Sequence, residues 1–237
     1  MSQTQRSGMR VYASVMTAAL LVAGGSAYRA EVQSAENVSF PEASVHFEQN
    51  ATDGDVEVVF EAKCGDDGLA SLKVVSPDGR TVIDFKAPDA STLGIRQFRM
   101  ESPEPRNVKL LKAGYPEGSY EFTGTTSSGA TLVGRSTLSH RLPAVTKFGT
   151  PAPEAKGVPT RDVELSWSAV ANVAFYIVEL EQDELGTRIR ATLPGSSSSF
   201  KVPNGFLKPG TEYQLGIGTV GEEGNTSFVE TTFTTKK

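Results

Sequence analysis

The sequence predicts an all-β protein that consists of two tandem antiparallel β-sandwiches. From residue 31 to the C-terminus, short runs of alternating apolar and polar residues are separated by Gly, Pro, Asn, Asp and Ser, as is typical of all-β sandwiches. No segment of this region has a convincing apolar period of 3.6, the period of an amphipathic helix. The chain has 237 residues, and without a leader this length makes roughly two domains of ordinary size.

Residues 1–27 have the pattern of a secretory signal peptide. Arg6 and Arg10 form a basic leader, and an apolar run of modest length follows. Small residues, Gly25 and Ala27, stand at the −3 and −1 positions for cleavage after Ala27. The alternative is an uncleaved membrane anchor, but the run is shorter than the ~20 apolar residues of a membrane span. We therefore expect a secreted or periplasmic protein with no membrane insertion after cleavage.

Charge and cysteine usage limit the partners and the chemistry. Removing the leader leaves 21 of the 23 Lys and Arg against 28 Asp and Glu, a net charge of −7 (21 − 28). Such a chain repels phosphate backbones and anionic lipid headgroups, so we expect no nucleic-acid partner. Cys64 is the single cysteine and allows no internal disulfide. We expect it to be a half-buried residue at a strand end.

Two turns define hairpins in the first half of the chain. Ser76-Pro77-Asp78-Gly79 separates two apolar runs, and Asp-Gly after Pro favours a tight turn. A second hairpin is expected to turn at Ser127-Ser128-Gly129. The strands expected in this half lie near residues 43–49, 55–62, 69–76, 80–86, 93–100, 107–112, 118–124 and 130–139.

A tyrosine also indicates a sandwich in this half. In Pro116-Glu117-Gly118-Ser119-Tyr120, Pro and Gly precede a strand that opens with Tyr, which is how sandwich domains enter a late central strand. Residues 28–142 therefore resemble an immunoglobulin-like sandwich, without the paired cysteines and the tryptophan of antibody domains. The domain boundary is expected at Arg141-Leu142-Pro143-Ala144. Because this link contains a proline and no Gly/Ser run, we expect it to be stiff.

The second half contains a more specific turn, from Leu207 to Tyr213. Pro209 presets φ and Gly210 supplies a positive φ, so the turn delivers a strand whose first inward side chain is Tyr213. Set beside Leu165-Ser166-Trp167 and Tyr176-Ile177-Val178, it makes residues from about 144 to 236 resemble a fibronectin type III domain, and we place this domain at residues 143–237.

The resemblance implies core positions for four side chains and no catalytic role for any of them. These side chains are Trp167, Tyr176, Leu207 and Tyr213. The resemblance also implies that the hydroxyl of Tyr213 bonds to backbone upstream of it. The strands expected in this half span residues 162–168, 173–181, 188–193, 198–202, 212–220 and 227–234.

Two motifs that resemble ligand sites are better explained as turns. Gly216–Gly221 matches the dinucleotide pattern G-x-G-x-x-G, but that chemistry needs a helix after the glycines. Here Glu222-Glu223-Gly224-Asn225 predicts a hairpin turn, so we expect no cofactor. Asp53-Gly54-Asp55 and Asp66-Asp67-Gly68 hold possible calcium ligands, yet neither continues as an EF-hand loop. Acidic residues with glycine are normal in turns.

Other candidate residues also have simpler interpretations. His46 and His140 lie in a chain with no H-E-x-x-H motif and no G-x-S-x-G elbow, so we expect solvated histidines, no metal and no catalytic residue. Asn37, Asn50 and Asn225 each begin an N-glycosylation acceptor triplet.

The sequence favours a non-catalytic protein that binds a protein partner of the envelope or the extracellular space, and we expect a monomer. The alternative is a secreted hydrolase or a carbohydrate-active accessory protein with its site in the first domain. The chain has one tryptophan, expected to be buried, which counts against an aromatic sugar platform.

Strand alternation predicts where the partner binds. If Tyr176 and Val178 face the core, their neighbours face outward, and the outward positions of the adjacent strand are mostly glycines. Apolar groups beside glycines form a shallow trough, and exposed apolar patches mark interfaces. The alternative is that the first domain or a long side chain covers the trough. The expected interaction face consists of Phe175, Ile177, Gly216, Gly218 and Val220.

Overall fold

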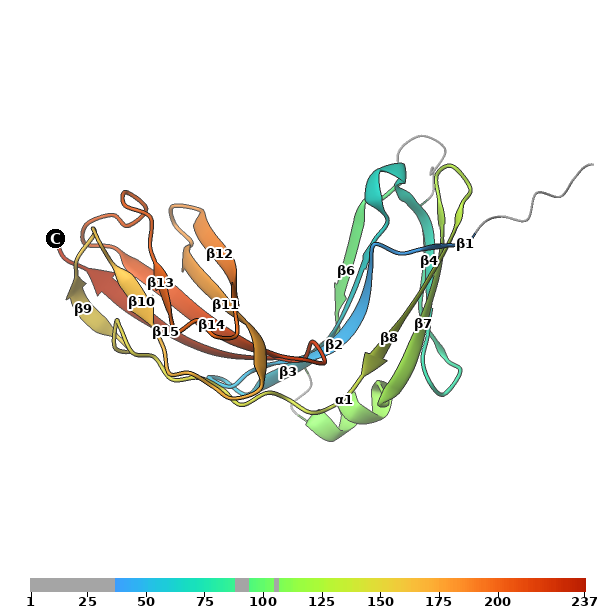
Figure 1. Cartoon of the computed structure of the whole chain (residues 1–237), viewed down its shortest axis with the longest axis horizontal. Coiled ribbons are helices and arrows are strands. Elements are labelled where there is room, and N and C mark those ends of the chain that lie inside the picture. Colours follow the sequence, from blue (N-terminus) through green and yellow to red (C-terminus); the bar gives the residue numbers. More distant parts are fainter. Residues whose placement is uncertain (1–36, 88–93, 105–106) are drawn as a thin grey trace, which may run out of the picture. The chain divides into compact units, whose positions relative to one another are not determined.

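The computed structural model describes residues 37–87, 94–104 and 107–237 (Figure 1). The expected signal peptide, residues 1–27, lies outside the described residues. Within the described ranges, fifteen strands accompany one short α-helix and one 3-10 helix, η1 (Gly65–Asp67). The all-β sandwich fold is confirmed, and most of its strand pairs are antiparallel.

The first sandwich encloses a hydrophobic core between two layers of strands. Phe47 and Phe60 from one layer meet Tyr120 and Phe122 from the other, and all four are buried. One layer is a five-stranded sheet in the order β1-β8-β7-β4-β5, and the other contains β2, β3 and β6. The bounds are β1 (Asn37–Ser39), β2 (Glu42–Asn50), β3 (Asp55–Lys63), β4 (Leu69–Val75), β5 (Thr81–Lys86), β6 (Gln97–Glu101), β7 (Gly118–Thr126) and β8 (Thr131–Leu138).

The second sandwich has a separate core and a fibronectin type III-like strand order. A small sheet of β10 and β13 packs against the strands β12-β11-β14-β15, and β9 adds to β15. Trp167, Tyr176, Leu207 and Tyr213 are buried in this core, as the sequence predicts. The bounds are β9 (Ala155–Val158), β10 (Glu164–Ser166), β11 (Val173–Gln182), β12 (Thr187–Pro194), β13 (Ser199–Lys201), β14 (Glu212–Gly221) and β15 (Thr226–Thr235).

Both tyrosine turns fix their strands through the phenol hydroxyl. The Tyr213 hydroxyl accepts a hydrogen bond from the Lys208 N–H at 2.9 Å and donates to the Phe206 carbonyl at 3.3 Å. The Tyr120 hydroxyl donates to the Pro116 carbonyl at 3.0 Å. In each sandwich a buried ring thus carries a polar tip that satisfies backbone groups of the preceding turn.

The strand expected at residues 107–112 is wrong, because this segment forms helix α1 (Val108–Gly114). Asn107 caps the helix by accepting a hydrogen bond from the Lys109 N–H at 3.1 Å. Leu111 is its buried residue, and Leu110 is 65% exposed. A helix this short turns too few side chains inward to show a period of 3.6. The strand expected at 93–100 is also shorter, since β6 begins at Gln97.

The two sandwiches share one continuous sheet. β15 pairs in parallel with β2 from Thr226↔Glu48 to Phe228↔Asn50. The result is an eight-stranded sheet, with seven strands in the order β12-β11-β14-β15-β2-β3-β6 and β9 paired to β15 beside this path. Asn225 is buried beside this junction. Its Oδ1 accepts from the Phe47 N–H at 2.8 Å, and its Nδ2 donates to the carbonyls of Ser139 and Arg141 at 3.0 and 2.9 Å.

Cys64 is buried, and the two histidines are partly buried. Burial raises the pKa of the Cys64 thiol, and its sulfur lies 3.0 Å from the Ile95 carbonyl oxygen. The expectation of solvated histidines is wrong. His140 Nε2 lies 2.8 Å from the Tyr115 carbonyl oxygen, and only 13% of the His46 side chain is exposed. Both histidines are thus partly buried rather than fully solvated.

Candidate interaction face

Strand β11 presents opposite characters on its two faces. Tyr176, Val178 and Leu180 are fully buried in the core, whereas Phe175 is 51% exposed and Ile177 is partly exposed. These β-branched and aromatic residues suit extended backbone, and alternation sends every second one outward. The structure therefore places Phe175 and Ile177 on the outer face of the sheet, at the side expected from the sequence.

The expected trough beside Ile177 is filled at Gly218. Register pairs Ile177 with Gly218 and Gly218 with Phe228, so the three positions form one row across β11, β14 and β15. A Cβ atom on Gly218 would lie 2.7 Å from the Phe228 ring, which means that the ring occupies the space that the missing side chain leaves. The expectation of an open trough over both glycines is therefore wrong at this position.

Gly216 and Val220 flank the filled position differently. A Cβ on Gly216 would meet only the side chains of Glu179 and Glu230, at 3.7 and 3.8 Å, which is ordinary contact distance. Val220 pairs with Phe175 and is partly exposed. The open apolar surface thus consists of Phe175, Ile177 and Val220, with Phe228 beside it on the same face.

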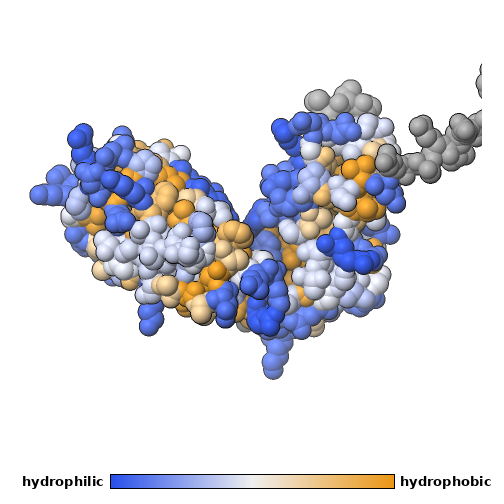
Figure 2. All heavy atoms as spheres, in the orientation of Figure 1, coloured by the Kyte–Doolittle hydropathy of each residue, from blue (hydrophilic) through white to orange (hydrophobic). Residues whose placement is uncertain are grey.

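Phe175 differs from the other exposed apolar residues in having such neighbours. Apolar residues reach the surface of both sandwiches among hydrophilic ones (Figure 2). Leu185 is as exposed as Phe175, and Leu110 is more exposed, but one lies in a turn and the other on a short helix. Single exposed apolar residues are normal, whereas a row of them on a flat sheet is the less common case.

An acidic pocket adjoins the open apolar surface on the same sheet. It encloses about 190 Å³ and takes in residues from both sandwiches. Phe228 forms part of its wall, so the filled row and the pocket share a side chain. We define the acidic pocket by its lining residues: Glu48, Asn50, Asp55, Glu57, Glu104, Glu179, Arg190, Phe228 and Glu230.

The acidic pocket concentrates negative charge. Glu48 and Glu57 are directly opposed on β2 and β3, and like charges in that position repel. Burial, and then repulsion by Glu101, Glu48 and Glu104, raises the pKa of Glu57 to about 7. Arg190 pairs with Glu179, and Asn50 Nδ2 donates to Glu230 Oε2 at 2.9 Å.

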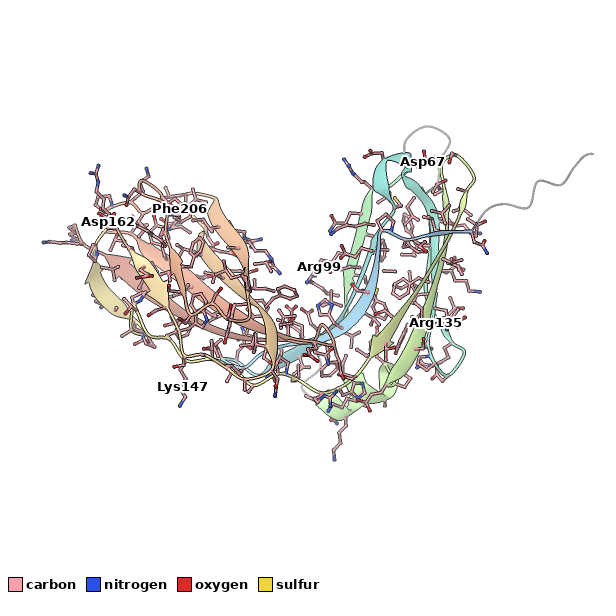
Figure 3. The ribbon with its side chains drawn as sticks, viewed as in Figure 1. Asp67, Arg99, Arg135, Lys147, Asp162 and Phe206 are labelled. Atoms are coloured by element: carbon pink, nitrogen blue, oxygen red, sulfur yellow. The ribbon has the colours of Figure 1, made fainter. Side chains whose placement is uncertain are left out.

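Arg99 neutralises a different pair of carboxylates. It projects from β6 on the side away from the five-stranded sheet (Figure 3) and contacts Glu61 and Glu101, at 3.0 and 2.7 Å. Arg99 lowers the pKa of Glu57, but less than the carboxylates and burial raise it. Arg99 is thus bound to carboxylates outside the lining of the acidic pocket, and Arg190 is the one cation within it, so the pocket retains its excess of carboxylates.

Sequence reasoning missed Phe228 and the carboxylates. Phe228 could have been predicted from the sequence, because pairing β15 against β14 places an outward residue opposite Gly218. The carboxylates could not have been predicted, because they meet only through the junction of β15 with β2. Neither strand's own sequence pattern indicates that junction.

The other motifs take structural roles. Gly216–Gly221 lies within β14 and is followed by a turn into β15, not by a helix. Asp53 Oδ1 accepts the Asp55 N–H at 3.1 Å, and Asp66 pairs with Arg96 at 2.6 Å. The acceptor triplet at Asn225 is inaccessible in the folded chain, because its amide is buried and hydrogen-bonded.

Among the described residues, no group of three or more His, Cys, Asp or Glu side chains is arranged to hold a metal ion. In the same part of the chain, no helix has the length and apolar character to cross a membrane.

Comparison with known proteins finds similarity to solved structures but not to family models or curated sequences. No protein-family model and no curated protein sequence matches it. The FN1–FN3 domains of chicken CNTN1 align with 85% of this chain at 12% identity and a TM-score of 0.35, and the chain covers 65% of that structure. The fibronectin(III)-like modules of Clostridium thermocellum CbhA align with 83% at 12% identity and a TM-score of 0.33, covering 91% of theirs. Two fibronectin type III domains of chicken tenascin align with 82% at 15% identity and a TM-score of 0.31, covering 98% of theirs.

Proposed function

We propose that the chain is an exported, non-catalytic binding protein whose partner docks on the outer face of β11, β14 and β15. Residues 1–27 are its cleaved signal peptide, and residues 28–142 and 143–237 are its two domains. The mature protein is a monomer, secreted or periplasmic, and its partner is a protein of the cell envelope or the extracellular space.

The observation that carries this proposal is the open apolar surface of Phe175, Ile177 and Val220, on a sheet whose other face is a closed core. Water disfavours such a row by roughly 25 cal/mol for each Å² of apolar area that a partner would cover. Aromatic residues are enriched at the centres of protein interfaces. Phe175 is the large aromatic side chain of this row, which makes it the expected anchor.

The experiment is capture of partners from an envelope extract by the mature protein, compared with two double variants. Phe175→Ser with Ile177→Ser removes the row. Leu110→Ser with Leu185→Ser removes two equally apolar, exposed residues from other surfaces and serves as the matched control. The proposal predicts that the first variant loses a specific partner and the control keeps it. Both variants are expected to have the same urea midpoint of unfolding as the wild-type protein, since all four residues are outside the cores. Equal capture by all three proteins would contradict the proposal.

A second candidate function, a secreted glycoside hydrolase, has one observation in its favour. The raised pKa of Glu57 would suit a general acid, and Glu48 is a second carboxylate opposite it. If the protein is such an enzyme, Glu57→Gln abolishes turnover of a panel of aryl glycosides and Phe175→Ser does not. If it is a binding protein, the wild-type protein shows no turnover above a heat-inactivated sample.

A further inference from the structure

We propose that the partner presents a lysine or arginine side chain next to an apolar one, and that the cationic side chain enters the acidic pocket while the apolar one packs on Phe175 and Ile177. This inference rests on the proposed function and names the chemistry of its partner.

The charge of the acidic pocket favours a cationic occupant. Six carboxylates and one guanidinium line the acidic pocket, a formal charge of −5 (1 − 6) when all are ionised. The single guanidinium, Arg190, is already paired with Glu179. A pocket lined by one sign of charge attracts ligands of the other sign and repels its own. It therefore selects a cation against phosphates, carboxylates and acidic segments.

The acidic pocket also has an apolar wall. Phe228 lines the acidic pocket and packs on Gly218, next to Ile177. Lysine and arginine have apolar stems that pack on such a wall while the charged group reaches the carboxylates, and a cation beside an aromatic ring gains further energy. A small metal ion gains nothing from Phe228, so the wall favours an organic cation.

The size of the acidic pocket and its continuity with the open apolar surface favour a protein segment as the occupant. The pocket of about 190 Å³ is roughly six times the ~30 Å³ that a water molecule occupies in the liquid, which is room for one long side chain. The row Phe175–Val220–Thr226–Glu48–Glu57 runs in register from the open apolar surface to the acidic pocket. A single partner segment that crosses the strands meets both, so the occupant is a protein segment and not a free amine.

Protonation of Glu57 supplies a diagnostic readout. Its pKa of about 7 reflects burial and the nearby Glu48, Glu101 and Glu104, opposed by Arg99. A bound cation favours the ionised form. If binding requires that form, the competent fraction is roughly 0.9 at pH 8 and 0.1 at pH 6, so the affinity rises about tenfold between them. Glu57→Gln removes the part of this dependence that comes from Glu57. His46 is the other group that faces this pair, with its Nε2 3.5 Å from Glu48 Oε2.

The test is a selection of binders from a displayed library of random peptides, carried out on the mature wild-type protein. Selected peptides are synthesised with a fluorescent label and titrated by anisotropy at about 150 mM salt, where distant charges are screened. We expect Lys or Arg beside an apolar residue to be enriched at least twofold over the input library. Glu48→Gln with Glu57→Gln should weaken the selected peptides at least tenfold, and Phe175→Ser should weaken them severalfold.

The matched control is Asp84→Asn with Glu212→Gln, which changes the net charge equally at exposed positions outside the acidic pocket. It should leave affinity within twofold of wild type. Selection without cationic enrichment, or equal losses in both charge variants, overturns this inference. So does a concentration-dependent dimer, seen by sedimentation, that the pocket variant dissociates, because the occupant is then a second copy.

The same peptides separate this inference from the proposed function. If the captured envelope protein depends on Phe175 and Ile177 but cationic peptides do not displace it, the docking face stands and the cationic occupant is wrong. If neither capture nor peptide binding depends on these residues, both proposals fail.

Discussion

Strands β7 and β14 are counterparts, one in each sandwich, and they differ on their outer faces. Each follows a turn that contains Pro and carries a buried tyrosine near its start. Along β7, exposed and buried residues alternate without interruption from Ser119 to Thr126. Along β14 the alternation stops after Gln214, and the outward residues Gly216 and Gly218 are buried like the inward ones. The comparison shows that one strand faces water, whereas the other is covered by its neighbours.

The cause lies in the neighbours and not in the strands' own patterns. Glu121 on β7 pairs with Arg135 of β8 at 2.6 Å, a solvent-exposed ion pair on an ordinary polar face. Beside β14, Phe228 of β15 lies over Gly218, and β15 pairs on its other side with β2. The outer face of the second sandwich is therefore part of a larger surface built by both sandwiches.

The largest expected effect comes from breaking that larger surface at Asn225. Asn225→Ala leaves the buried Phe47 N–H and two carbonyls without their partners, and each orphaned group costs about 1–3 kcal/mol. We expect a loss of about 3 kcal/mol in the free energy of unfolding, measured by urea titration with circular dichroism. Ser128→Ala, in the corresponding β7–β8 turn, should lose less than about 1 kcal/mol because that side chain is in an exposed turn. Equal small losses would mean that the junction does not stabilise the fold.

The two glycines of β14 give the next largest contrast. Gly218→Ala forces the Phe228 ring to move and should destabilise by about 2 kcal/mol, as overpacking does. Gly216→Ala meets only ordinary contacts and should be neutral or stabilise slightly, because alanine loses less backbone entropy on folding. Thermal unfolding of both variants measures the difference. If Gly216→Ala is the more harmful, Phe228 is not the group that covers this face.

The tyrosine turns offer a smaller contrast between the sandwiches. Tyr213→Phe orphans the Lys208 N–H and the Phe206 carbonyl, whereas Tyr120→Phe removes the hydrogen bond to the Pro116 carbonyl. We expect losses of about 1.5 and about 1 kcal/mol, within the range for removed buried hydrogen bonds. Urea titration decides, with Trp167 fluorescence for the first variant and circular dichroism for the second. A loss below about 0.5 kcal/mol for Tyr213→Phe would show that its hydroxyl is not bonded.

Local chemistry explains which parts of the fold were predictable. The turns at Pro77-Asp78-Gly79 and Pro209-Gly210 depend on residues beside each other in the chain, so the hairpin and the tyrosine strand were foreseen. The burial of Trp167 and Tyr176 was expected from the resemblance to fibronectin type III domains, and the structure buries both. Helix α1 escaped because Leu111 is its one buried side chain, too few for a helical period to appear.

The candidate site was predictable only where it lies within one strand. Phe175 and Ile177 follow from alternation on β11. Glu48 and Glu230 reach the same pocket only because β2 pairs with β15, a contact between residues nearly the whole chain apart. The polar residues of β2 and β3 read as an ordinary solvated face until that junction is known.

The smallest expected effect comes from comparing a carboxylate of the acidic pocket, Glu57, with an exposed carboxylate on β7, Glu121. Glu57 has an ordinary pKa of 4.5 and a folded value of about 7, so between these values the folded chain binds more protons than the unfolded chain. The free energy of unfolding therefore falls as pH rises through this window and stays reduced above it. Glu57→Gln removes the charge. At pH 8 we expect it to be more stable than wild type by about 1 kcal/mol, below the value of the full shift because solvent screens a partly exposed carboxylate. At pH 4.5 the two should be nearly equal.

On β7, Glu121→Gln loses an exposed ion pair and should be neutral or slightly less stable at both pH values. Urea titrations at the two pH values measure all three proteins, and a gain for Glu121→Gln equal to that for Glu57→Gln would show that the acidic pocket carries no special repulsion.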